Sequence, residues 1–389
     1  MRYTNQEIVN FILDDIEANP RKLVEDQMRD QNFVSLFGGK SDHEIRGVIL
    51  DYPLNANIFA SVLYDRVISK GVVEGLNTKD KFSIFRREEL KNASRWYRIA
   101  TDVKEVNDFE PESSPIPKTE SRIGVCYSDE PIRIRIDFTF SPQQLATAFE
   151  SETGLSELLS AEMKAVRDTV NIYRNQVMID KIKSVIENND VKEGMLYNFP
   201  ALGSMGIDIA VFLDYFANFD NTNVALDYLH SIFTDDDTIP NRVKQKTTLE
   251  YIVDTFKIKV LDDLKRMSEP SRDFNIGDSD GAYMRSLNKE NAVLIINSRL
   301  ATLNDFYKKI NLNDYFVDVI EINDTMIGDT VSFGYMIVDK NFFEIRDMLD
   351  TTLDWTNPKS LYTNYFTHIW FGTLTNPFVN AFARYISLD

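Results

Sequence analysis

Two short patterns near the N-terminus resemble parts of phosphate and zinc sites, and each lacks a residue that the chemistry needs. The stretch Gly38–Ser41 resembles the end of a phosphate-binding loop, but Val34 occupies the position of the first glycine. His43 and Glu44 begin a zinc-binding HExxH pattern, but Gly47 stands where the second histidine is required. Both patterns therefore predict ordinary loop and helix residues, with no nucleotide or zinc site.

Two acidic clusters are the next candidates. The stretch Asp273–Gly281 could hold calcium, but a twelve-residue calcium loop needs glycine at its sixth position and glutamate at its twelfth, where this chain has Asp278 and Met284. Asp235–Asp237 form a second cluster that could serve a carboxylate-dependent hydrolase. Because the chain has 61 Asp and Glu residues, however, such pairs carry little information. We expect solvated acidic turns at both places, and no metal or cofactor.

The cysteine and the histidines also give no strong candidate for a catalytic or metal site. Cys126 could pair with a distant histidine as a nucleophile, but it lies in a strand-like stretch, where a small buried hydrophobic residue is the commoner role. His368 lies among aromatic residues, which is typical of a packed or interface histidine. Beside the single cysteine the chain has only three histidines, which are far apart in sequence: His43, His230 and His368.

The remaining candidates are Arg133, Arg135 and Asp137, on a strand predicted over Ile132–Phe140. Strand side chains alternate between two faces, so these residues share a polar face and the isoleucines and phenylalanines form an apolar one. Two arginines on such a face are either solvated or paired with carboxylates of a neighbouring subunit, and the residues leave both alternatives open. We treat all three as candidates for inter-subunit contacts.

The strand leads directly into helices. Ser141, Pro142 and Gln144 have the types expected at the N-cap, first and third positions of a helix. A second helix is predicted over Leu155–Glu187, where apolar residues recur at spacings of three and four. If unbroken, that helix would be about 50 Å long.

The N-terminal third is predicted to change from helix to strand. Residues 1 to about 75 are expected to be helical, with a capping box formed by Thr4 and Glu7. The pattern over Lys81–Val103 predicts strands, and the polar, proline-rich stretch Val106–Ser121 predicts an exposed loop. A two-stranded arm with this loop at its tip is the simplest geometry.

The C-terminal half is predicted to be mixed. Its expected elements are a helix capped by Thr247 and Glu250, a buried strand over Ala292–Leu300, a strand over Phe333–Val338 followed by a helix near Asn341–Leu349, and a strand over Thr363–Leu374.

Composition and charge limit the classes of function. With 389 residues, two or three packing units are expected, and 43% hydrophobic residues favour a globular chain. The net charge of -18 opposes gripping of nucleic acid, although it would suit a wall around packed DNA. One cysteine favours a reducing compartment. We expect no secretion signal, and no membrane helix because the most apolar window, Phe199–Phe219, carries Asp208 and Asp214.

In the order of its elements the chain resembles the major capsid proteins of tailed bacteriophages, which have the Hong Kong 97-type fold. The resemblance is carried by Arg133–Ile182 and Val293–Phe378, and it is closest to capsid proteins of small short-tailed phages of Gram-positive hosts. It implies an α+β fold with an N-terminal helical arm, an extended E-loop, a long spine helix, and peripheral and axial domains. No maturation cleavage site and no lysine and asparagine pair for cross-linking can be assigned.

The same resemblance implies domain boundaries. They are an N-terminal arm with helices over 1–94, an E-loop over 95–140, a peripheral domain with the spine helix over 141–197, an axial domain over 198–330, and a return to the peripheral domain over 331–389. Arg133 and Arg135 would lie at the base of the E-loop, which crosses a neighbouring subunit.

The implied function is that of a structural major capsid protein and not of an enzyme. Copies would assemble as pentamers and hexamers into an icosahedral head that encloses double-stranded DNA without sequence-specific binding. Assembly would take place in the host cytoplasm, with a scaffolding protein and a portal as possible partners and without a membrane. The alternatives are an acidic cytoplasmic carboxylate-dependent hydrolase and the shell protein of a cellular nanocompartment.

Overall fold

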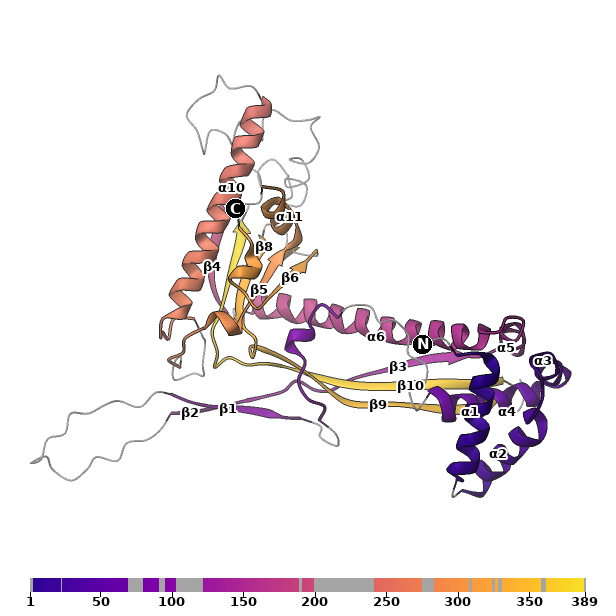
Figure 1. Cartoon of the computed structure of the whole chain (residues 1–389). Coiled ribbons are helices and arrows are strands. Elements are labelled where there is room, and N and C mark those ends of the chain that lie inside the picture. Colours follow the sequence, from indigo (N-terminus) through magenta and orange to yellow (C-terminus); the bar gives the residue numbers. More distant parts are fainter. Residues whose placement is uncertain are drawn as a thin grey trace, which may run out of the picture.

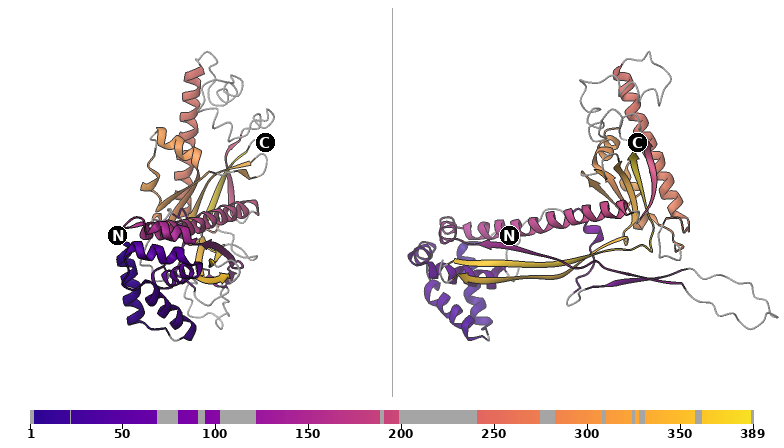
Figure 2. Two further views of the ribbon diagram at one scale, coloured as in Figure 1. Left: turned by 90° about the vertical axis from the view of Figure 1, so that its right-hand side faces the viewer. Right: turned by 180° about the vertical axis from the view of Figure 1, so that it is seen from behind.

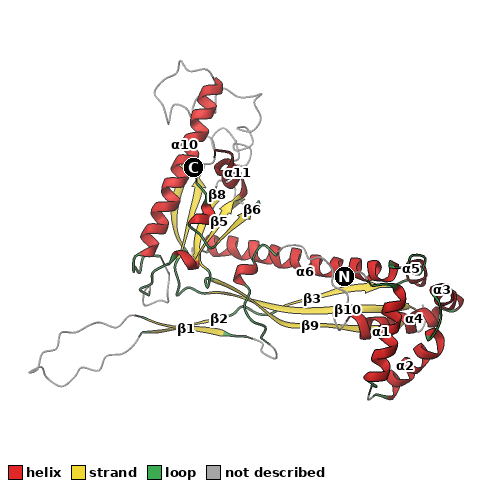
Figure 3. Ribbon diagram, in the orientation of Figure 1, coloured by secondary structure: helices red, strands yellow, loops and turns green. Residues whose placement is uncertain are grey.

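The computed structural model combines an N-terminal helical unit, a long helix beside a three-stranded sheet, a domain built on a larger sheet, and a two-stranded arm (Figure 1). Figure 3 shows how helices and strands are distributed among these parts. The structure describes residues 3–21, 23–68, 80–90, 95–102, 122–188, 191–198, 241–274, 283–307, 310–323, 326–327, 331–357 and 362–387.

The N-terminal unit is helical, as predicted. Thr4 and Glu7 form the expected capping box at the start of the first helix. Phe33, Phe37 and Phe59 lie at the centre of the core of this unit, with neighbouring ring centroids 5.1 to 5.7 Å apart. The helices are α1 (Asn5–Ala18), α2 (Val24–Phe37), α3 (Asp42–Asp51) and α4 (Pro53–Leu63), followed by a π-helical turn over Tyr64–Ile68.

A buried ion network joins these helices. The Arg66 guanidinium lies 2.8 Å from the Asp15 carboxylate and 2.5 Å from that of Asp30, and Arg66 and Asp30 are both buried. Arg21 lies 2.9 Å from Asp65 and 3.7 Å from Asp30. Burial of these charges is tolerated because each carboxylate faces at least one guanidinium.

Two further helices follow the first strand of the central sheet. Ser141 and Gln144 form the predicted capping box of α5 (Pro142–Ala148). The predicted long helix is α6 (Gly154–Glu187), and its length is about 50 Å. Its first turns, with Leu155 and Leu159, belong to the core of the N-terminal unit. Its last turns pack against the larger sheet, so α6 connects two separate cores.

A three-stranded antiparallel sheet runs beside α6, in the order β3, β10, β9. Its strands are β3 (Ile132–Thr139), β9 (Phe343–Asn357) and β10 (Tyr362–Thr375). Both predicted strands, β3 and the one near Thr363–Leu374, are confirmed. The predicted helix near Asn341–Leu349 is wrong, since β9 begins at Phe343. Local sequence there suits a helix, but pairing along the whole length of β10 and burial of Phe343 and Ile345 favour a strand.

The larger sheet has the strand order β4, β11, β8, β5, β6, and β7 pairs with β8. Its strands are β4 (Lys192–Asn198), β5 (Ala292–Asn297), β6 (Asp318–Ile322), β7 (Met326–Ile327), β8 (Val331–Asp339) and β11 (Ala381–Ser387), and it is flanked by α10 (Asn241–Ser268) and α11 (Ser298–Tyr307). The strands predicted at residues 292 and 333 are confirmed, although β5 ends at Asn297. Thr247 and Glu250 lie inside α10, so the cap predicted there is wrong.

A buried charge pair fixes α10 to this sheet. The Asp263 carboxylate on α10 is fully buried and accepts two hydrogen bonds from the Arg384 guanidinium, at 2.5 and 2.7 Å. It also accepts the hydroxyl of Tyr335, at 2.6 Å. Burial beside Asp263 raises the pKa of Tyr335 well above its usual range, which keeps this phenol protonated.

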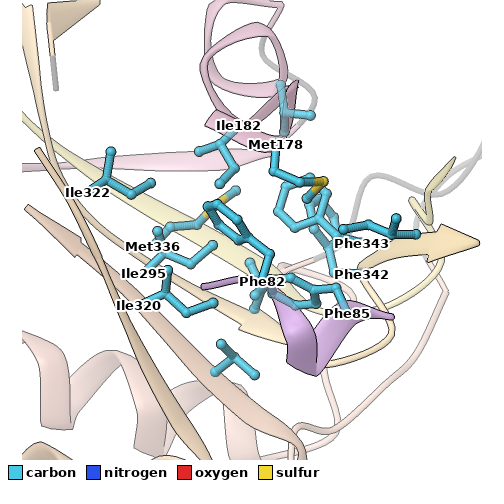
Figure 4. Close-up of a cluster of buried hydrophobic side chains, with 14 of the residues drawn as sticks. Phe82, Phe85, Met178, Ile182, Ile295, Ile320, Ile322, Met336, Phe342 and Phe343 are labelled. Carbon is cyan, nitrogen blue, oxygen red and sulfur yellow. The ribbon is translucent and has the colours of Figure 1, made fainter. Parts of the chain in front are cut away.

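The larger sheet and α6 share a core that also includes Phe82, Ile84 and Phe85. Phe82 and Phe85 lie at a 3-10 turn, Ser83–Phe85, and insert between α6 and the strands of the sheet (Figure 4). The strands predicted over Lys81–Val103 are therefore only partly correct. The turn occupies the start of that range, and a strand, β1 (Tyr97–Thr101), occupies its end.

Candidate functional site

The two-stranded arm has one apolar face that is exposed to solvent. The strand β1 pairs with β2 (Ile123–Tyr127) as an antiparallel hairpin that projects from the body (Figure 2). In this register, alternate side chains of both strands share a face. The side chains on one face are between 45 and 65% exposed, and they are Tyr97, Ile99, Ile123, Val125 and Tyr127.

The opposite face of the arm packs on the body of its own chain. Gly124 approaches Tyr283 and Phe378 so closely that a Cβ atom there would lie 2.5 Å from both side chains. Ala100 and Cys126 belong to the same small cluster. This face uses small residues because the hairpin lies directly against two aromatic rings.

Polar contacts fix the root of the arm. The Arg98 guanidinium donates to the buried Glu344 carboxylate at 2.5 Å. The Asp102 carboxylate accepts from the Met284 amide and from Arg272, both at 3.0 Å. These contacts orient the described part of the arm, residues 95–102 and 122–127, without help from another chain.

Trp96 adds an apolar anchor at the same root. Its ring lies against Gly372 of β10, where an added Cβ would be 2.6 Å from it. The guanidinium of Arg346, which is opposite Gly372 in β9, lies over the same ring at 5.6 Å from its centroid. The arm therefore has a fixed inner face and an apolar outer face that its own chain leaves exposed. Exposed patches of this kind are typical of protein interfaces.

Arg133, Arg135 and Asp137 lie on β3, which begins five residues after β2 ends. They share the face of the three-stranded sheet that is turned away from the α6 core, because Ile132, Ile134 and Ile136 point into that core. The three candidates are thus brought together, on the body of the protein and outside the hairpin.

The neighbours of these residues come from β10. The Arg133 guanidinium lies 4.5 Å from the centre of the Trp370 ring, and that of Arg135 lies 5.3 Å from the centre of Phe366. Arg135 also forms an ion pair with Asp137, 2.9 Å apart, in which both side chains are about half exposed. Such an exposed pair contributes little stability, so it can exchange its partners for those of another chain.

The catalytic candidates have structural roles where the structure describes them. Gly38–Ser41 connects α2 to α3, with Gly39 at φ 69 and Ser41 in a capping box with Glu44. Cys126 is half-buried, and burial raises the pKa of its thiol, which opposes nucleophilic reactivity. His368 is opposite Arg135 in the sheet.

Most residues of the two acidic clusters are not among those that the structure describes. Asp235–Asp237 and residues 275–281 lie outside the described residues. Among the residues that are described, no three His, Cys, Asp or Glu side chains gather as a metal site. Within the same residues, no helix has the length and apolar character to cross a membrane.

Sequence reasoning did not single out the outer face of the arm. The signal was present as an alternation of large apolar residues with small or charged ones in Tyr97–Thr101 and Ile123–Tyr127. Each strand has only five residues, which is too short for periodicity alone to show which face is buried.

The chain matches one protein-family model over most of its length. Residues 21–385 match the family model described as Phi29-like phage major capsid protein. The comparison with curated proteins gave no match.

Solved phage structures are similar at low identity. A chain of the capsid of Staphylococcus phage Andhra is 11% identical, with 81% of this chain and 85% of that chain covered and a TM-score of 0.47. A chain of native bacteriophage P68 is 10% identical, covering 81% and 86%, with a TM-score of 0.44. A chain of Mycobacterium phage Bobi is 9% identical, covering 83% and 98%, with a TM-score of 0.40. The assignment to a family rests on the family model.

Proposed function

The chain belongs to the Phi29-like phage major capsid protein family, and from this premise we propose how its copies join into a shell. Membership makes it a structural protein of the virion capsid, as predicted, and confirms the α+β capsid fold class. Beyond that, we propose that the copies form pentamers and hexamers of an icosahedral head, in which the arm of one copy crosses the next.

The observation that carries this proposal is the division of the arm into a fixed and a free face. Arg98, Asp102 and Trp96 hold the root in one orientation, so little conformational entropy remains to be lost when a neighbour binds. The outer face exposes five large apolar side chains, which gain free energy when they are buried. In a shell every copy is surrounded by further copies of the same chain, so a second copy is the expected partner of this face.

We assign the named parts of the capsid fold accordingly. The E-loop is the arm within 95–140, the spine helix is α6, the axial domain lies within 198–330, and the peripheral domain comprises 141–197 and 331–389, after an N-terminal part over 1–94. Arg133 and Arg135 would then contact carboxylates of a neighbouring copy, and Asp137 would contact a cationic side chain, because all three lie exposed near the base of the arm.

The contents and partners of the shell are also proposals. A net charge of -18 suits a wall that encloses double-stranded DNA without binding it. A scaffolding protein and a portal would assist assembly in the host cytoplasm. We propose that the chain is not an enzyme, because its family is one of structural proteins.

Neither alternative is favoured. A carboxylate-dependent hydrolase would need an acidic site, and the family assignment is to a structural protein. A nanocompartment shell would share the fold, but the family model describes phage proteins.

Charge on the outer face of the arm tests the proposal. Ile99→Glu and Val125→Glu place a carboxylate on that face, where it is solvated in the single chain but would be buried in a shell. We expect both variants to fold, as judged by circular dichroism, and to lose closed particles in light scattering and negative-stain microscopy. Ile258→Glu on α10, where the side chain is 67% exposed, is the matched control and should form particles. Closed particles from both arm variants would contradict the proposal.

A further inference from the structure

Three of the four charged residues of the helix α2, Asp26, Arg29 and Asp30, lie on the side that faces the protein. Asp30 is buried against Arg66, Asp26 lies 3.6 Å from Arg21, and Arg29 donates to Ser61 at 2.6 Å. Phe33 and Phe37 complete this inner side. The usual pattern of a surface helix is the reverse, with charges in solvent and apolar residues inside.

The solvent side of α2 is uncharged along its axis. Val24, Met28, Gln31 and Ser35 recur at spacings of four, three and four, so they form one stripe opposite the buried residues. Val24 is 69% exposed and Met28 59% exposed. Further exposed residues lie beside the stripe, and only one of them, Glu25, is charged. The others are Leu23, Gln27, Asn32 and Val34.

The neighbouring helix α1 provides a contrast within the same unit. Its exposed residues include Glu7, Asp14 and Glu17, which is the charged solvent face expected of a surface helix. The uncharged face of α2 is therefore not a general property of the N-terminal unit.

We propose that this face of α2 packs against the same face of α2 in a second copy of the chain. This inference rests on the proposed function, because it assigns one of the contacts that a shell needs. In a twofold contact each surface must be complementary to itself. A stripe of Val24, Met28, Gln31 and Ser35 meets this condition, because it brings no like charges together between two chains of net charge -18.

The position of α2 favours the same partner. The helix lies at the end of the molecule opposite the arm (Figures 1 and 2). The arm and α2 can therefore join a copy to different neighbours, which a closed surface requires. Met28 is well suited to the centre of such a contact, since its flexible side chain adapts to the opposing surface.

A charge in the stripe is the first test. Met28→Glu should retain the circular dichroism spectrum and melting temperature of the parent chain, because the side chain is exposed, but should lose closed particles in negative-stain microscopy. Ile258→Glu on α10 makes the same kind of change at an exposed apolar residue outside this face, and it is the matched control that should assemble. Particles from Met28→Glu at the yield of the parent would overturn the inference. If the parent chain formed neither shells nor capsomers, alone or with a scaffolding protein, the proposed function would fail and this inference would fail with it.

Disulfide trapping is the second test, and it identifies which protein covers this face of α2. In a Cys126→Ser background, Met28→Cys should give a band of twice the chain mass when assembled particles are oxidised, while Ile258→Cys should give none. Loss of the band in disassembled protein would tie the contact to the shell. A Met28→Cys product linked to a co-expressed scaffolding protein, or assembled particles without any dimer band, would overturn the inference.

Discussion

The side-chain oxygen of Asn5 accepts a hydrogen bond from the backbone amide of Leu155 at 2.9 Å. Asn5 is fully buried, and its side-chain amide donates to the carbonyls of Ser151 and Ala148, at 2.7 and 3.2 Å. Thr153, the N-cap residue that precedes α6, makes no such cap with its own side chain. A residue of α1 therefore caps α6, the longest helix in the described part of the chain.

Asn5→Ala should lower the free energy of unfolding by about 1–3 kcal/mol, because it removes the cap and leaves buried backbone groups unpaired. Urea denaturation followed by circular dichroism measures this loss. Asn10→Ala on the exposed side of α1 is the control and should change stability by less than about 0.5 kcal/mol. Equal stability of the two variants would show that the cap is unimportant.

Arg384→Met should destabilise the protein by about 3–5 kcal/mol, since it leaves the Asp263 carboxylate buried without its guanidinium. Arg266→Ala removes a guanidinium that is 3.9 Å from Asp263 and more than half exposed, and should cost less than about 1 kcal/mol. The melting temperatures of the two variants test the difference, and a smaller shift for Arg384→Met than for Arg266→Ala would refute this role.

Gly124→Ala should displace the arm from the body, because the added Cβ would meet Phe378 and Tyr283 at 2.5 Å. We expect faster proteolysis of the arm and a lower yield of closed particles. Gly47→Ala, in α3, has open space around its Cβ and should be neutral or stabilising by up to about 1 kcal/mol. A Gly124→Ala protein with the protease resistance of the parent would show that the inner face tolerates the methyl group.

Asp339 should make stability depend on pH. Burial raises the pKa of its carboxyl, so the native state binds the proton more readily than the unfolded state does. The contribution of Asp339 to stability therefore falls as pH rises from the unfolded pKa, about 3.9, through the raised native pKa.

Asp339→Asn keeps an oxygen for the Asn341 amide, 2.8 Å away, but has no proton to lose. Compared with the parent, the variant should gain relative stability between pH 4 and neutral pH, as measured by urea denaturation at each pH. Asp314→Asn, at an exposed site, is the control for the loss of one carboxylate. If the stability of Asp339→Asn changed with pH in parallel with that of the parent, Asp339 would not be the source of this pH dependence.

Arg135→Glu should weaken assembly if Arg133 and Arg135 contact carboxylates of a neighbouring copy. We expect the variant to fold, because the Arg135 side chain is 58% exposed, and to form fewer closed particles. Lys289→Glu makes the same change of charge at another exposed position and should assemble. Equal particle yields from both variants would remove Arg135 from the contact.

Local patterns predicted the elements that depend on neighbouring residues. The capping boxes of Thr4 and Ser141, the long helix α6 and the alternation along β3 all follow from residues within one or two turns or strands. These features were readable because the interactions that stabilise them join residues three or four apart, or alternate along a strand.

Features that depend on distant partners were not predicted. The first half of β9 was predicted as a helix, near Asn341–Leu349, because its pairing with β10 is not visible in that stretch alone. Asn5 and Leu155 are 150 residues apart, so no local pattern shows that one caps the other. The outer face of the arm is recognisable only once Gly124 is seen against Tyr283 and Phe378.

The most direct test is to image the purified full chain by negative-stain microscopy and to measure its size by light scattering. The chain is expressed alone and then together with a candidate scaffolding protein. We predict closed shells, or ring-shaped capsomers of uniform size, in at least one preparation. A strict monomer or dimer in both preparations would contradict the account of this chain as a self-assembling capsid protein.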